Sequence, residues 1–153
     1  MYSVREALMS LKPMKSAPDT KETIPFFGEL VPAGFPSPAA GWEEAELNLH
    51  TLVVTHPAST YFLRVTGDSM QDARIHSGDV LVVDRSETPE QGSIVVASID
   101  NEFTVKKLIL RPRPCLMPMN PAYPPIYFDP ESNDVEIWGV VTYSLMKHKK
   151  CMA

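Results

Sequence analysis

The sequence predicts a mainly β protein, with a compact, twisted and partly closed antiparallel sheet that follows an extended N-terminal arm. Three observations predict this class. Short runs rich in β-branched and aromatic residues recur from about Tyr61 onward, as is typical of strands. Clusters of glycine or proline divide these runs. No repeat of roughly 20–50 residues, which would indicate a solenoid or propeller, is present.

The first 40 or so residues differ in composition from the rest. They hold six of the fifteen prolines, at positions 13, 18, 25, 32, 36 and 38. Proline removes a backbone donor and biases the residue before it toward extended geometry, so this region predicts an extended arm rather than a long helix. The pattern allows a short helix at Val4–Leu11, but no helix-turn-helix before Gly34. We therefore expect an arm over 1–40 and a β domain over 41–153.

Each predicted strand of the body is an apolar run bounded by turn residues. Residues 61–65 lead into a turn that contains glycine, residues 79–84 follow the turn signal SGD, and residues 93–99 follow PEQG. Only Asp100-Asn101 separates 93–99 from 102–110, which predicts a two-residue hairpin. The remaining runs are 114–119, 126–128 and 135–145. The last run is either a core strand or an edge available for dimerisation.

Length and composition limit the class of protein. With 153 residues and 44% hydrophobic content, the chain is large enough for one domain with a core. No apolar run approaches the roughly 20 residues that span a bilayer, and the N-terminus has no apolar signal-peptide core. Cys115 and Cys151 lack metal-site spacing, so neither a disulfide framework nor a metal site is indicated. We expect a cytoplasmic protein with no membrane contact, no metal and no cofactor.

Charge is distributed unevenly along the chain. Residues 1–33 hold four basic and four acidic side chains, whereas residues 34–153 hold 10 basic and 15 acidic ones, so the net charge of −5 lies in the body. Because a phosphate backbone binds positive surfaces, we expect no direct specific DNA binding. Any role near DNA should then run through another protein.

The stretch Thr66–Met70 (TGDSM) presents a serine directly after the predicted strand 61–65. A serine hydroxyl is a weak nucleophile unless a base lies within hydrogen-bond reach. No GxSxG motif is present, and no histidine lies in a recognisable triad context. We interpret all four histidines as surface or partly packed residues: His50, His56, His76 and His148.

Lysine is the alternative base, provided that it is neutral. The usual lysine pKa is about 10.4, and burial lowers it by up to roughly 3–5 units. Only Lys106 and Lys107 lie in strand-like segments of the body. Strand alternation places them on opposite faces, so one points inward and the other outward. Both faces are apolar, so periodicity does not choose between them, and two solvated lysines near an edge are an equally good interpretation.

The motif TGDSM is followed, 37 residues after its serine, by the first lysine of TVKK. This pair resembles the Ser-Lys self-cleaving peptidase domain of LexA-type repressors and UmuD-type polymerase accessory proteins, and more distantly that of bacterial signal peptidases. The resemblance to the UmuD branch covers Gly34 to about Ser144. It rests also on GFPSPAAG, HPASTYFLRV, GDVLVVDRS, GSIVVA, EFTVKKLILRP, MPMN and IWGVV. The resemblance implies a fold of the LexA/signal-peptidase type.

The resemblance also implies roles for individual residues. Ser69 is expected to be the nucleophile and Lys106 its neutral general base, with Lys107 as the outward neighbour. Gly67 and Asp68 are expected to shape the turn. A carboxylate beside the lysine would raise the lysine pKa, which is the wrong direction, so we assign Asp68 to turn chemistry. By the general logic of such sites, the backbone N–H groups of Ser69 and Met70 are expected to hold the oxyanion.

The expected substrate is the chain's own arm. The family cleaves itself at an Ala-Gly or Cys-Gly bond upstream of the dyad, and Ala33-Gly34 matches, 36 residues before Ser69. Small residues allow close backbone approach, and Pro32 and Pro36 favour extended chain. An Ala-Gly pair in a proline-rich linker is ordinary by itself, but the dyad and the spacing favour this bond. Because a tethered bond has a high effective concentration, the arm must usually lie away from the cleft, or the lysine must stay protonated.

The resemblance further implies partners. In the family, a RecA filament on single-stranded DNA promotes cleavage. The resemblance implies a trimmed homodimer of residues 34–153 that joins a UmuC-type Y-family DNA polymerase in error-prone translesion synthesis, as part of the SOS response. A repressor role is not expected without a helix-turn-helix. Two other classes stay open: a Ser-Lys processing peptidase acting in trans, and a non-catalytic β module that binds proteins.

Overall fold

The computed structural model describes residues 14–15, 24–27, 33–34 and 43–149. The chain divides into two compact units, one of residues 17–55 and one of residues 1–16 and 56–153. The short helix expected at Val4–Leu11 and the second cysteine, Cys151, lie outside the described residues. The division into an arm over 1–40 and a domain over 41–153 stays a prediction.

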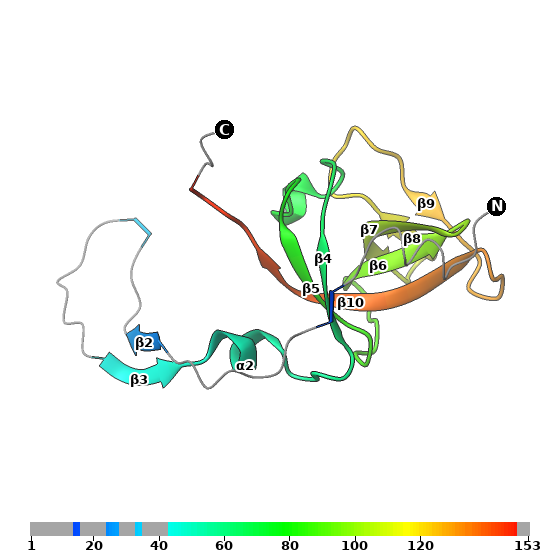
Figure 1. Cartoon of the computed structure of the whole chain (residues 1–153). Helices are drawn as coiled ribbons and strands as arrows, with labels where there is room; N and C mark the ends of the chain where they lie inside the picture. The colour runs from blue at the N-terminus through cyan, green and yellow to red at the C-terminus, as the bar shows by residue number, and fades with distance from the viewer. Residues whose placement is uncertain (1–13, 16–23, 28–32, 35–42, 150–153) are drawn as a thin grey trace. The chain divides into compact units, whose positions relative to one another are not determined.

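The described residues of the smaller unit form a two-stranded antiparallel ribbon and one short helix (Figure 1). β2 (Ile24–Phe27) pairs with β3 (Glu43–Leu47), and the register shifts near the end of β2. α2 (Leu49–Val53) follows directly. Its N-cap is Asn48, whose side-chain oxygen accepts a hydrogen bond of 3.0 Å from the backbone N–H of Thr51. Neither β3 nor α2 was predicted from the sequence.

The larger unit is one sheet of eight strands in the order β1-β4-β5-β10-β6-β7-β8-β9, and every neighbouring pair is antiparallel. The strands are β1 (Met14–Lys15), β4 (Thr60–Arg64), β5 (Val80–Asp84), β6 (Ile94–Ile99), β7 (Glu102–Ile109), β8 (Cys115–Met117), β9 (Ile126–Tyr127) and β10 (Val135–Leu145). The prediction of a mainly β, antiparallel fold is confirmed, and each of the seven predicted runs contains a strand. Among the described strands the order is linear and β1 does not pair with β9, so the sheet is open instead of partly closed as the sequence predicted.

β10 is the longest strand and joins the two halves of the sheet (Figure 1). Its first half pairs with β6 and its second half with β5, with a register shift in each ladder. Such bulges bend a strand. Gly139 lies at one of these shifts, and a Cβ atom there would lie 2.6 Å from Cγ1 of Val83. Glycine therefore allows β5 to approach β10 closely at this bend.

β6 and β7 form the hairpin that the sequence predicts. Asp100 and Asn101 make up its two-residue turn, with φ angles of 50° and 65°. Positive φ at both positions is what the favoured two-residue hairpin requires. The turn sets the register of the ladder, in which Lys106 lies opposite Val95.

Hydrophobic residues cover both faces of the sheet around β6. Val96 belongs to a cluster with Leu63, Met70, Ile75, Leu81, Val83 and Trp138. Its neighbours Val95 and Ala97 belong to a second cluster with Leu108 and Leu116. A strand buried on both faces reads as a continuous apolar run instead of an alternating one, which explains the sequence SIVVASI. β7 is also covered on both faces, since Val105 packs on the first cluster and Leu108 belongs to the second.

Candidate active site

Ser69 lies in the turn between β4 and the short 3-10 helix η1 (Gln71–Ala73). Gly67 has a φ of +90°, in the left-handed region that favours glycine, so the chain reverses direction here. Ser69 itself is half-buried, and the next residue, Met70, is buried in the hydrophobic core. The anchored methionine and the glycine turn together present the serine side chain at the surface of the core.

Lys106 comes from the middle of β7, and its side chain is buried, with 7% exposed. Its Nζ lies 3.1 Å from Oγ of Ser69. The same nitrogen donates to Oγ1 of Thr104 at 2.7 Å and to the carbonyl oxygen of Val105 at 3.1 Å. The structure therefore brings together the two residues that the sequence singled out as nucleophile and base, and adds Thr104 as a third contact.

The surroundings of Lys106 favour its neutral form. Burial lowers the pKa of its amine. In the part of the chain that the structure describes, no carboxylate forms an ion pair with it. A half-buried lysine, Lys107, follows on the strand. Because no opposite charge offsets the burial, Lys106 has the electrostatic environment that a neutral amine base needs.

Asp68 forms hydrogen bonds with the segment 119–123. Its Oδ1 accepts a hydrogen bond of 2.5 Å from the hydroxyl of Tyr123. Its backbone oxygen accepts from Nδ2 of Asn120 at 3.0 Å and from the backbone N–H of Gln71 at 3.3 Å. These contacts hold the turn, in line with the turn role expected for this aspartate. Neither Asn120 nor Tyr123 was predicted individually from the sequence.

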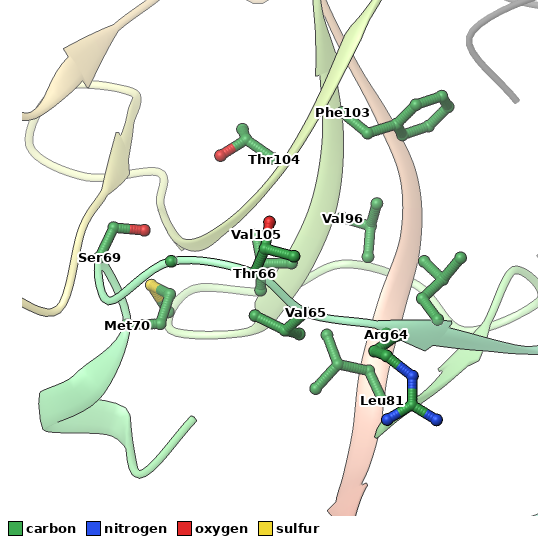
Figure 2. Close-up of a pocket in the computed structure, with 12 residues that line it drawn as sticks. Arg64, Val65, Thr66, Ser69, Met70, Leu81, Val96, Phe103, Thr104 and Val105 are labelled. Carbon is green, nitrogen blue, oxygen red and sulfur yellow. The ribbon is translucent and has the colours of Figure 1, made fainter. Parts of the chain in front are cut away.

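A pocket of about 130 Å³ adjoins Ser69 (Figure 2). Its walls come from β4, β5, β6, β7 and the turn that carries the serine. Most of the lining side chains are apolar: Leu63, Val65, Met70, Leu81, Val96, Phe103 and Val105. Apolar pockets of this kind bind apolar groups and orient them through a few polar groups at the wall. The hydroxyls of Ser69 and Thr104 are two such groups (Figure 2).

The remaining predicted site groups are backbone atoms. The N–H groups of Ser69 and Met70 donate to no acceptor among the described residues, so both are available to a ligand. Ala33 and Gly34 are exposed and lie in a bend within the smaller unit. Exposure is what a scissile bond needs to enter a cleft. The assignment of these four residues to an oxyanion hole and a cleavage site stays a prediction.

His56 takes part in a polar network with Asp84 and Glu87. Its Nδ1 lies 2.5 Å from Oδ2 of Asp84 and 3.9 Å from Oε1 of Glu87. One donor atom from each of these three residues lies within 4.8 Å of the others, close enough to hold a metal ion. Asp84 also accepts hydrogen bonds from Ser59 and Ser86, so hydrogen bonding accounts for the cluster. His56 was expected to be a surface or partly packed residue, and this network was not predicted from the sequence.

Comparison with known proteins identifies the family. The chain matches the peptidase S24-like family over residues 25–142, well over half of its length. The chain belongs to this family. The resemblance to LexA-type and UmuD-type proteins is thereby confirmed, and membership supports a self-cleaving serine peptidase in general terms.

Individual relatives of this S24-like protein cover most of its length. It is 65% identical over 130 residues to protein MucA of Salmonella typhimurium, which covers 85% of this chain and 89% of that protein. Protein ImpA of Salmonella typhimurium is 44% identical over 141 residues, covering 91% and 94%. The LexA repressor of Azoarcus sp. is 40% identical over 119 residues, covering 77% of this chain and 58% of the repressor. Within the described residues, no helix has the length and apolar character needed to cross a membrane.

Proposed function

We propose that this protein is a self-cleaving peptidase in which Ser69 is the nucleophile and Lys106 the general base. The observation that carries the proposal is the 3.1 Å separation between Oγ of Ser69 and a buried amine without an ion-pair partner among the described residues. A neutral amine at this distance can accept the serine proton directly. The bond cut is Ala33-Gly34, whose small residues suit the small apolar pocket beside the serine.

The proposed reaction has two stages. Lys106 takes the proton of the Ser69 hydroxyl while Oγ attacks the carbonyl carbon of Ala33. The backbone N–H groups of Ser69 and Met70 hold the resulting oxyanion. The ammonium group then protonates the leaving nitrogen of Gly34, and Ala33 remains attached to Ser69 as an ester. Lys106, neutral again, removes a proton from a water that hydrolyses this ester and restores the serine.

Self-cleavage is tested with the purified full chain. Incubation at mildly alkaline pH should yield a fragment whose N-terminal residue is Gly34, as determined by intact mass and N-terminal sequencing. Ser69→Ala and Lys106→Ala should abolish the cut, while Lys107→Ala, a matched change on the same strand, should leave it. Intact protein after long incubation, alone and with RecA filaments on single-stranded DNA, would overturn the proposal and favour a non-catalytic binding module.

The cellular role proposed here follows from the family and from the relatives MucA and ImpA. RecA filaments on single-stranded DNA stimulate the cleavage, and the trimmed product joins a UmuC-type Y-family polymerase in translesion synthesis in the cytoplasm. Control of this form needs only a docked and an undocked state of the substrate segment, because a partner that prefers the docked state shifts the balance toward cleavage. The test compares cleavage rates with and without RecA filaments, and looks for co-purification of the trimmed chain with the polymerase.

The trimmed product is proposed to be a homodimer. Among the described strands, Val141–Leu145 of β10 pairs with β5 alone, since the ladder with β6 ends at Val140. Exposed apolar side chains lie along this half-strand and directly after it: Tyr143, Leu145 and Met146. An unpaired strand edge with apolar neighbours can add a strand from a second copy. Sedimentation of the trimmed chain should give a dimer, and Tyr143→Asp should weaken it, while Tyr127→Asp on the distant edge strand β9 should not.

A further inference from the structure

Asn120 contacts the peptide unit that precedes the nucleophile. Its Nδ2 donates a hydrogen bond of 3.0 Å to the backbone oxygen of Asp68. This oxygen and the N–H of Ser69 belong to the same planar peptide unit, in which a trans bond points the two groups in opposite directions. Fixing the direction of the Asp68 carbonyl therefore fixes the direction of the Ser69 N–H.

The amide group of Asn120 is itself held in place. Its side chain is buried, with 8% exposed. Its Oδ1 accepts a hydrogen bond of 3.0 Å from the backbone N–H of Ala122, so the nitrogen end must point toward Asp68. The backbone oxygen of Asn120 accepts from the N–H of Tyr123 at 3.1 Å. Both the nitrogen and the oxygen of the Asn120 amide group are thus hydrogen-bonded, and the residue lies in a local turn that fixes its position.

Two further bonds join the same segment to the serine turn. The hydroxyl of Tyr123 donates to Oδ1 of Asp68 at 2.5 Å. On the other side of the serine, the backbone N–H of Asp72 donates to the backbone oxygen of Met119 at 2.8 Å. The segment 119–123 is therefore hydrogen-bonded to the turn on both sides of Ser69. The N–H groups of Ser69 and Met70 have no hydrogen-bond partner among the described residues.

We propose that Asn120 is a positioning residue, which aims the Ser69 N–H at the oxyanion through the Asp68 carbonyl, with Tyr123 as a second support of the same turn. This inference rests on the proposed self-cleavage. A hydrogen bond to the carbonyl end also polarises the peptide unit and makes its N–H a stronger donor. Preorganised donors of this kind lower the barrier because they need no reorientation as charge develops.

The test measures first-order self-cleavage of the full chain across a range of pH. Asn120→Ala should lower the plateau rate by about 10- to 100-fold. This decrease is no larger than the one expected when a whole oxyanion-hole donor is removed. The midpoint of the pH profile should stay where it is, since Lys106 is untouched. Tyr123→Phe should lower the plateau by a smaller factor. Asn133→Ala and Tyr127→Phe, at exposed residues outside the serine turn and the segment 119–123, are the matched controls and should cleave at the wild-type rate.

Asn120→Asp separates the positioning role from a purely structural one. Aspartate keeps an oxygen for the N–H of Ala122 but offers no donor to Asp68. We expect a plateau loss at least as large as that of Asn120→Ala, with a thermal midpoint close to that of the wild type. Wild-type plateau rates in both Asn120 variants, or in the aspartate variant alone, would overturn the inference. A wild-type chain that never cleaves would instead overturn the proposed function.

Discussion

Nζ of Lys106 lies 3.1 Å from Oγ of Ser69, although 37 residues separate them in the chain. The β6–β7 hairpin places the lysine, and the glycine turn after β4 places the serine. The amine is buried without a carboxylate among the described residues to offset its charge. Burial of the amine should therefore make Lys106 a better base and also lower the stability of the folded protein. Both the cleavage rate and the free energy of unfolding can be measured.

Self-cleavage should accelerate with pH and then level off. Burial lowers the pKa of Lys106, so the reactive neutral form gains population at a pH where an exposed lysine is still charged. The midpoint of the rate profile should thus lie below about 10.4, the usual lysine value. The measurement is the appearance of the Gly34 fragment by mass spectrometry between about pH 6 and 11. Lys107→Ala should reproduce the profile, and a midpoint at or above the usual lysine value would contradict the prediction.

Lys106→Met should make the protein more stable while removing the proposed base. Methionine has a similar length and no charge to bury, so the variant avoids the desolvation of the amine. We expect a gain of about 1 kcal/mol in unfolding free energy at neutral pH. Gains of this size are typical when a residue that serves function at the expense of stability is replaced. Urea titration checks this in a Ser69→Ala background, which keeps both chains intact.

The pH dependence of this gain has a definite sign. Because the folded pKa of Lys106 is lowered, the unfolded chain binds more protons than the folded one between the two pKa values. The stability of the parent therefore rises with pH through that window, and the advantage of the methionine variant should shrink toward zero. Lys107→Met is the control and should give little change at any pH. A methionine variant less stable than its parent at neutral pH would refute the account.

The fold was predictable because most strands are bounded by clear turn signals. The Asp100-Asn101 hairpin and the full extent of β10 both follow from the sequence alone. α2 was missed because five residues are too few for a helical period to show. β3 has the sequence EEAEL, whose glutamates do not favour strands, and tertiary pairing with β2 overrides that preference.

The site was predictable only in part. Alternation puts Lys106 and Lys107 on opposite faces, but both faces of β7 are covered, so only the resemblance selected Lys106. The partners of Asn120 could not be foreseen for another reason. Asn120-Pro121 does signal a turn, yet its bond to Asp68 crosses 52 residues of sequence. Contacts of that range depend on how the strands pack, which local patterns do not encode.

Gly139→Ala should destabilise the sheet where β10 bends. A Cβ atom at this position would lie 2.6 Å from Cγ1 of Val83, closer than two carbons can approach without displacement. Val83 is fully buried, so relief requires a shift in the core, with an expected cost of about 1–3 kcal/mol. Chemical denaturation in the Ser69→Ala background measures it. Glu136→Ala, at an exposed position of the same strand, is the control, and equal stability of the two variants would count against the close approach.

His56→Ala should lower the thermal midpoint more in mild acid than in mild alkali. Nδ1 of His56 pairs with Oδ2 of Asp84, and this hydrogen bond, opposed by partial desolvation and aided by the charges of Asp84 and Glu87, raises the pKa of the histidine. A raised folded pKa gives stability that is complete below the unfolded value of about 6.5 and is lost as pH rises through the folded value. We expect a clear loss near pH 6 and a smaller one near pH 9.

Asp84→Asn tests the same pair by changing its acidic partner. Burial alone would raise the pKa of Asp84, but hydrogen bonds from Ser86, His56 and Ser59 outweigh it and hold the pKa at about 2. The stability that the Asp84 carboxylate contributes to the fold is therefore complete above its unfolded pKa of about 3.9. This contribution disappears as pH falls toward 2. The asparagine variant should be less stable than its parent near pH 6 and approach it near pH 2. His148→Ala, in the exposed tail, should show no such pH dependence, and losses independent of pH in the His56 and Asp84 variants would show that the pair acts without its charges.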